Sequence, residues 1–338
     1  MTAFSQSKEC RKEVGKNKAK DKRDDQTQQT DAYCGFALSP NQMKLYFQTG
    51  NKEQQNYRHL DDRLSFWVQQ QQVGVAEQQQ SIWLPGYRAV LQGKPLQGLE
   101  DDEVSGLTYS AESDTLFTVT GKYPQLIELT LDGQVLRRID LLGFANPEGV
   151  EMLSDGRLAI IDERKRTLTT FKLSALTRRL EFADLPSFDL GFIDAGNKGF
   201  EGIAWDSRNE RVLLGKERGP LGLFSLPFPG EDGATGTLEP MSSGHLFLRD
   251  ISSLTYDPRT GHALVLSDES SLLLEVDALG EPVSFISLSR GMNGLHGGIE
   301  QAEGVTMDAA GNIYIVSEPN LFYVLRKDPV AEQPAVAD

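Results

Sequence analysis

Residues 301–320 read QAEGVTMDAAGNIYIVSEPN, and this stretch predicts a β-hairpin. Apolar and polar residues alternate on both sides of a small-residue turn, Ala309-Ala310-Gly311, as they do in a half-buried pair of strands. Glu303 precedes the first strand, and Glu318 follows the second. Because the two strands of a hairpin run antiparallel, both carboxylates are expected at its open end.

Four similar hairpins occur earlier in the chain. A small residue marks the first strand of each of the five, and the steps between these markers are 43, 53, 51 and 51 residues; the markers are Gly106, Gly149, Gly202, Ser253 and Gly304. A third strand such as residues 126–129 and a more polar fourth strand such as residues 135–141 follow the hairpin. Four strands at a period of 40–50 residues are typical of a β-propeller blade.

The count of strands predicts how the ring closes. The fifth unit has three strands and lacks a fourth, whereas residues 87–91 form a spare strand before the first unit. The sequence therefore predicts an all-β fold, a five-bladed β-propeller with the N-terminal strand closing the last blade, which leaves no long exposed sheet edge. Six blades are the alternative if residues 36–83 form another sheet. A β-sandwich is a weaker interpretation because it does not require equal repeats.

The domain boundaries follow from composition. Residues 1–35 are rich in lysine, glutamine and aspartate, and residues 36–83 mix short apolar segments with glutamine runs. Residues 1–83 are therefore predicted to be a disordered or weakly structured extension with an amphipathic helix over 60–76. The propeller is predicted to occupy residues 84–328, and residues 329–338 to form a flexible tail.

The charge is distributed unevenly. Residues 1–60 carry a net charge of +4 and residues 61–338 one of −19, giving −15 in all. An acidic body repels phosphate backbones, so nucleic-acid binding by the main domain is not expected. The excess of negative charge suits a cation as the ligand. The alternative interpretation is that it serves only to keep the protein soluble. The two cysteines, Cys10 and Cys34, precede the propeller, so no disulfide is expected to cross it.

Glutamates recur at equivalent positions of the five hairpins. In a propeller the first strand of each blade leads away from one channel mouth and the second returns to it. The residues that open the first strands are Ser105, Glu148, Glu201, Ser252 and Glu303, and we call these positions the opening slots. The residues that close the second strands are Gly121, Glu163, Glu217, Glu269 and Glu318, and we call these the closing slots. Both sets are expected to face the same mouth.

Crowded carboxylates raise one another's pKa unless a cation compensates their charge. Ca²⁺ is the best candidate because it accepts six to eight oxygen ligands in a flexible geometry. The predicted metal-binding residues are Glu148, Glu201, Glu303, Glu163, Glu217, Glu269 and Glu318. The alternatives are that the opening glutamates tie blades together through backbone amides, and that the closing glutamates are structural or solvated. Lys216 and Arg164 are candidates for neutralising part of the charge.

Other chemistries have little support in the sequence. The four histidines show no zinc-binding spacing, and neither a phosphate-binding loop nor a nucleophile elbow is present. No catalytic residue is predicted. His296 lies in a glycine-rich loop over residues 294–299, from which it could overhang the mouth.

The chain resembles the SdiA-regulated family of bacterial β-propellers over roughly residues 84–326. The motifs that carry the resemblance are Ser105-Gly106-Leu107-Thr108-Tyr109, Asp162-Glu163-Arg164, Gly199-Phe200-Glu201-Gly202, Lys216-Glu217, Leu266-Ser267-Asp268-Glu269-Ser270, and residues 301–320 with Phe322-Tyr323. The resemblance implies a five-bladed propeller, distantly related to NHL-repeat propellers, with a calcium site. It also implies a membrane-anchored or periplasmic location. The sequence itself shows neither an apolar run of about 18 residues nor a signal peptide, which favours retention in the compartment of synthesis.

These observations predict a calcium-binding propeller that acts as a binding module for a small molecule or a protein at the carboxylate-lined mouth. The alternative is a metal-dependent hydrolase of lactones, esters or phosphoesters that uses the same site. Membrane association is implied by the resemblance alone, and a monomer is the default expectation.

Overall fold

The computed structural model describes residues 62–191, 199–219, 221–228, 236–241 and 245–328. They belong to the second of two units into which the chain divides, Ser39–Asp338. Most of the predicted N-terminal extension and the predicted C-terminal tail lie outside the described residues. Within the described residues, no helix combines the length and the apolar character that crossing a membrane requires.

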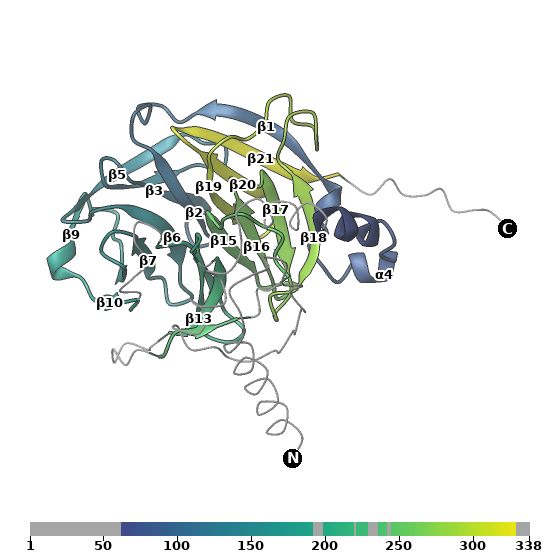
Figure 1. Cartoon of the computed structure of the whole chain (residues 1–338). Coiled ribbons are helices and arrows are strands. Elements are labelled where there is room, and N and C mark those ends of the chain that lie inside the picture. The colour runs from purple at the N-terminus through teal and green to yellow at the C-terminus, as the bar shows by residue number, and fades with distance from the viewer. Residues whose placement is uncertain (1–61, 192–198, 220, 229–235, 242–244, 329–338) are drawn as a thin grey trace, which may run out of the picture. The chain divides into compact units, whose positions relative to one another are not determined.

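The strands form five sheets, which are the blades of the predicted propeller (Figure 1). Blade 1 contains β2 (Val104–Ser110), β3 (Thr115–Thr120), β4 (Gln125–Leu129), β5 (Val135–Leu142) and β9 (Arg179–Glu181). Blade 2 contains β6 (Pro147–Met152), β7 (Leu158–Asp162), β8 (Thr167–Phe171) and β10 (Ser187–Asp189). Blade 3 contains β11 (Phe200–Asp206), β12 (Arg211–Lys216), β13 (Gly222–Pro227) and β14 (Glu239–Pro240). Blade 4 contains β15 (Ser253–Asp257), β16 (His262–Ser267), β17 (Leu272–Val276) and β18 (Pro282–Ser287). Blade 5 contains β19 (Ala302–Met307), β20 (Ile313–Ser317), β21 (Leu321–Lys327) and β1 (Tyr87–Pro95).

Blade 1 differs from the predicted four-strand pattern. After β8 the chain returns to blade 1, where β9 pairs in parallel with β5 as a fifth strand. The short helix η2 (Phe182–Asp184) then leads to β10, the outer strand of blade 2. This detour lies within the 53-residue step, the longest in the sequence.

The inner strands form a closed ring in which β2, β6, β11, β15 and β19 each contact the next, and β19 contacts β2. Glycine permits this close approach, because a Cβ atom on Gly149 would lie 2.5 Å from the carbonyl oxygen of Glu201 on the neighbouring inner strand. The apolar core lies between the blades, and strands β7, β17 and β20 are buried over their whole length. The five-bladed fold predicted from the repeats is confirmed.

The N-terminal strand closes the last blade, as predicted. β1 pairs antiparallel with β21, with Tyr87 opposite Lys327 and Pro95 opposite Leu321, and it runs along the outer side of this blade (Figure 1). The hydroxyl of Tyr87 donates to the carbonyl oxygen of Gly311 at 2.8 Å. The strand is therefore fixed both to β21 and to the β19–β20 turn.

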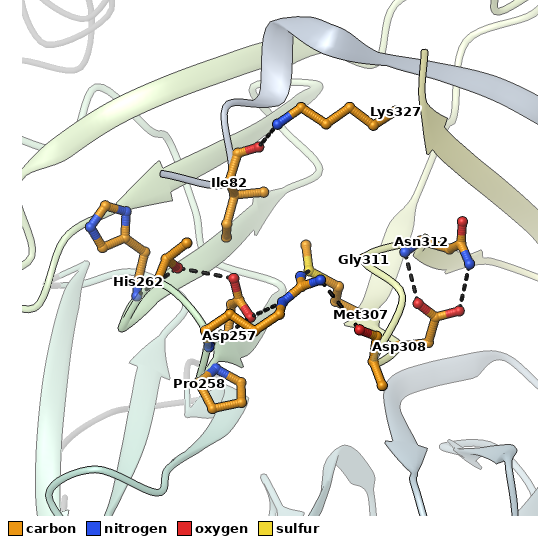
Figure 2. Close-up of polar contacts among 12 residues, drawn as sticks. Ile82, Asp257, Pro258, His262, Met307, Asp308, Gly311, Asn312 and Lys327 are labelled. Carbon is orange, nitrogen blue, oxygen red and sulfur yellow. Dashed lines mark hydrogen bonds and ion pairs between the residues drawn. The ribbon is translucent and has the colours of Figure 1, made fainter. Parts of the chain in front are cut away.

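The residues that precede β1 pack on blade 4. Residues 62–70 are helical, and a turn separates them from α4 (Val75–Gln78), so the predicted helix over 60–76 is interrupted. Phe66 packs against Phe285, and the side-chain oxygen of Gln70 accepts a hydrogen bond from the Phe285 amide at 2.7 Å. Beyond α4, Lys327 donates to the carbonyl oxygen of Ile82 (Figure 2). The short helix η1 (Leu84–Gly86) then leads into β1.

Candidate functional site

One backbone contact repeats in the blades and brings the opening and closing slots together. The amide of the closing-slot residue donates to the carbonyl oxygen two positions before the opening slot. The pairs are Gly121 to Glu103 at 3.0 Å, Glu163 to Asn146 at 3.0 Å, Glu217 to Gly199 at 3.2 Å, and Glu318 to Gln301 at 2.9 Å. Both slots therefore lie at the end of the ring where the inner strands begin, and we call this end the mouth.

A β-bulge sets the direction of each opening glutamate. The strand pairing shifts by one residue at Glu148, Glu201 and Glu303, so each is the extra residue in its inner strand. Such bulges redirect a side chain that a regular strand would bury in the sheet face. The blade 4 inner strand, β15, pairs regularly with β16, and its opening slot holds Ser252.

Three carboxylates meet closely at the mouth. Oxygen atoms of Glu163, Glu201 and Glu217 all lie within 4.8 Å of one another, and these residues come from blades 2 and 3. Burial, followed by the charges of Glu217, Glu148 and Glu303, raises the pKa of the Glu201 carboxyl well above its usual value. Glu201 is thus the position at which the largest number of neighbouring glutamates act.

The other opening glutamates have the same electrostatic character. Burial and the charge of Glu163 raise the pKa of Glu148 to about 8, although a hydrogen bond from Asn146 opposes the shift. Burial and the charges of Glu148 and Glu318 raise the pKa of Glu303 well above its usual value. Burial is also the main reason that the pKa of Glu318 is raised. Ionising these groups together is therefore unfavourable without a cation.

The closing glutamates have partners among the described residues. Glu163 accepts from the amide of Gly199 at 2.9 Å, and a Cβ atom on that glycine would lie 2.5 Å from Glu163 Cγ. Arg218 donates to both Glu217 and Glu269. The side-chain amide of Gln301 donates to Glu318 at 3.0 Å. These four glutamates therefore combine a structural role with their position at the mouth.

The opening slots hold either serine or glutamate, and the two residue types make different contacts. The serine hydroxyls tie neighbouring blades, because Ser105 donates to the carbonyl oxygen of Glu148 at 2.8 Å and Ser252 to that of Ala302 at 2.7 Å. Among the described residues, no hydrogen bond joins the carboxylates of Glu201 or Glu303 to a backbone amide. In blades 1 and 4 the opening-slot serines therefore tie their inner strand to the next blade.

Several residues that shape the mouth were not predicted from the sequence. Asn146 donates to both Glu148 and Glu163, and the charge of Asp268 raises the pKa of Glu303 and of Glu318. Arg218 pairs with the closing glutamates Glu217 and Glu269. Lys216 is buried and donates to the Arg218 carbonyl oxygen, and Arg164 is exposed. The missed residues lie within two positions of a slot, which was the signal available in the sequence.

His296 lies at the outer edge of blade 5. Its side chain is exposed, and its amide donates to the side-chain oxygen of Gln92 in β1 at 2.8 Å. The loop that carries this histidine therefore packs on β1, the outermost strand of the blade.

The fold and the site together define a five-bladed propeller with glutamates from several blades at one mouth. The sequence model of the SdiA-regulated family matches residues 79–326, and the chain belongs to that family. The match covers all five blades and begins just before the residues that lead into β1.

Solved structures of similar fold include enzymes of several kinds. A glutaminyl cyclase from Myxococcus xanthus is 20% identical, with a TM-score of 0.49 and coverage of 72% of this chain and 97% of that chain. A gluconolactonase from Xanthomonas campestris is 14% identical, with a TM-score of 0.43 and coverage of 70% and 96%. A streptogramin B lyase is 11% identical, with a TM-score of 0.40, and this chain covers 65% of its length and matches it over 67% of its own. At these levels of identity the similarity concerns the fold alone.

Proposed function

We propose that this propeller binds a calcium ion at the mouth through Glu163, Glu201 and Glu217, and that the mouth serves as a binding module for a ligand or partner. The observation that carries the proposal is the meeting of these three carboxylates within 4.8 Å. Two oxygens that bind one Ca²⁺ at 2.3–2.6 Å are separated by at most about 5 Å. The spacing of the three groups is therefore compatible with a shared cation.

The chemistry of the donors also fits calcium. The group offers carboxylate oxygens only, which suits a hard cation and not zinc or copper, for which cysteine or histidine ligands are usual. Glu148 and Glu303 border the group and add negative charge, since both raise the pKa of Glu201. Glu269 and Glu318 lie further out, where Arg218 and Gln301 hold them. A bound ion would neutralise the crowded carboxylates and offer its remaining coordination positions to oxygen atoms of a ligand.

The alternative function, a metal-dependent hydrolase, has less support. Hydrolysis at a metal usually needs a base near the activated water. The one histidine that the sequence offered for this role, His296, lies in the loop between β18 and β19, and its amide bonds to Gln92 of β1. The binding module is therefore the function that the arrangement of residues favours.

Thermal unfolding tests the proposal directly. The full-length protein, stripped with EGTA, is melted with and without added Ca²⁺. We expect Ca²⁺ at about 100 times its dissociation constant to raise the Tm by about 5–10 °C, because a ligand specific for the folded state stabilises it by about 2.7 kcal/mol. Glu201→Gln should remove most of this shift. An unchanged wild-type Tm would sink the proposal.

Glu151→Gln provides a matched control. Glu151 belongs to the same inner strand as Glu148, and burial raises its pKa to about 8. Its carboxylate accepts from the Thr108 hydroxyl and the Trp205 amide, away from the mouth. The calcium-induced shift in Tm should survive this substitution.

A further inference from the structure

Arg218 is a cationic side chain placed within the acidic mouth. It directly follows Glu217, in the loop after β12, and its Nε donates to Glu217 Oε1 at 2.5 Å. Its Nη2 contacts the same oxygen, and its Nη1 donates to Glu269 Oε1 of the neighbouring blade. With 37% of the side chain exposed, the guanidinium lies at the boundary between the carboxylates and solvent.

The two ion pairs keep the guanidinium in place. Burial opposes the charge, but the hydrogen bond and the charges of Glu217 and Glu269 outweigh burial and raise the pKa of Arg218. One of these partners, Glu217, also belongs to the group of three carboxylates proposed to hold calcium. Arg218 and a metal ion would therefore draw on the same negative charge.

The other side of the mouth has a different composition. Glu148 and Glu318 accept hydrogen bonds from the neutral side-chain amides of Asn146 and Gln301. These amides carry no net charge, so they would not repel an incoming cation as a guanidinium does. The mouth is thus asymmetric. Glu217 has a positively charged neighbour, Arg218, whereas the amides that bond to Glu148 and Glu318 are neutral.

We propose that Arg218 acts as a built-in competitor of the metal ion, occupying Glu217 when the cation is absent and lowering the affinity of the mouth for calcium. The inference rests on the proposed function and adds the regulation of that site. A divalent ion at Glu217 and a guanidinium on the same carboxylate repel each other at short range. Arg218 therefore sets a threshold of calcium concentration. Below this concentration, Arg218 keeps its ion pairs with Glu217 and Glu269.

Titration calorimetry with CaCl₂ on the EGTA-treated full-length protein tests this role. Arg218→Met keeps the length of the side chain and removes its charge, and we expect it to bind calcium at least tenfold more tightly than the wild type. Arg218→Lys retains the charge without the planar fork. It should therefore stay within a few-fold of the wild-type affinity.

A second arginine provides the matched control. Arg137 pairs with Glu128 in blade 1 through Nη2 at 2.7 Å, and both side chains are more than four-fifths buried. Arg137→Met breaks a comparable ion pair outside the mouth and should leave the calcium affinity unchanged. In the absence of metal, Arg218→Met should lower the Tm because the ion pair between Arg218 and Glu217 is lost.

The outcomes separate this inference from the proposed function. If the wild type binds calcium in a manner sensitive to Glu201→Gln, but Arg218→Met binds it equally or more weakly, the role of Arg218 is wrong and the calcium site stands. If neither the wild type nor Arg218→Met binds calcium, both are wrong. Should Arg218→Met fail to fold, Arg218→Lys decides, because an affinity more than tenfold below that of the wild type contradicts competition.

Discussion

Buried acidic residues occur at both ends of the inner strands, but their hydrogen-bond partners and neighbouring charges differ between the two ends. Away from the mouth, Asp206, Asp257 and Asp308 each accept several hydrogen bonds within their own turn (Figure 2 shows Asp257 and Asp308). Asp206 binds the Arg211 guanidinium at 2.8 Å, Asp257 binds Arg259, and Asp308 binds the side chain and the amide of Asn312. These carboxylates are fully used in shaping the β-turns.

The pKa shifts at the two ends have opposite directions. At the end away from the mouth, burial alone would raise the pKa of Asp206, but hydrogen bonds from Asn209 and Arg211 lower it. At the mouth, burial and neighbouring glutamates raise the pKa of Glu201 and of Glu303. The comparison teaches that repetition of an acidic residue does not reveal its role. Its surroundings do, because a carboxylate whose neighbours are mainly donors is stabilised in its ionised form, whereas carboxylates that crowd one another are stabilised together by a cation.

The largest expected effect is at the structural end. Asp206→Ala leaves Arg211 and the amides of the turn without their acceptor, and we expect it to lower the free energy of unfolding by about 3 kcal/mol. Urea unfolding of the EGTA-treated protein measures this cost. If the free energy of unfolding falls by less than about 1 kcal/mol, the aspartate is not the structural residue that this comparison requires.

The corresponding change at the mouth should have the opposite sign. Glu303→Gln replaces a crowded carboxylate with a neutral amide of the same shape, so the metal-free protein should gain about 1 kcal/mol in its free energy of unfolding. Asp308→Asn is the matched substitution at the other end of β19 and should destabilise, because Asn312 and Tyr314 donate to that carboxylate. If both substitutions destabilise equally, the glutamate is structural as well.

The third expected effect is a dependence of stability on pH. The pKa of Glu148 is about 8 in the folded protein and about 4.5 when unfolded, so between these values the folded state binds more protons. Its contribution to the stability of the metal-free protein therefore falls as the pH rises from about 4.5 to about 8. Glu148→Gln should make the slope less negative, by at most about 1.4 kcal/mol per pH unit. Urea unfolding at pH 5, 6, 7 and 8 in EGTA measures this difference, and identical slopes would contradict it.

The repeats in the sequence were sufficient to predict the ring, its five blades and the closing strand. Alternation of apolar residues identifies strands, and the five marker positions fix the period. The spare strand at residues 87–91 then had one partner left, the unpaired edge of β21. The parallel addition of β9 to β5 was not predictable, because Arg179–Glu181 is too short to show a strand pattern and its partner lies in another blade.

The candidate site was predictable only in part. Equivalent positions in the repeats predicted which glutamates reach the mouth. They did not predict that Glu163, Glu201 and Glu217 approach one another most closely, because the distance depends on bulges and on how blades 2 and 3 pack. Arg218 was missed although it directly follows a closing slot, because the residue at that position differs between blades and its contacts depend on how blades 3 and 4 pack.

A crystal structure of the protein grown with CaCl₂, with an anomalous difference map, tests the central claim most directly. The account predicts a calcium peak about 2.3–2.6 Å from oxygen atoms of Glu163, Glu201 and Glu217, with Arg218 moved away from Glu217. A mouth without an ion, with those carboxylates still bound to arginine and backbone amides, would contradict it.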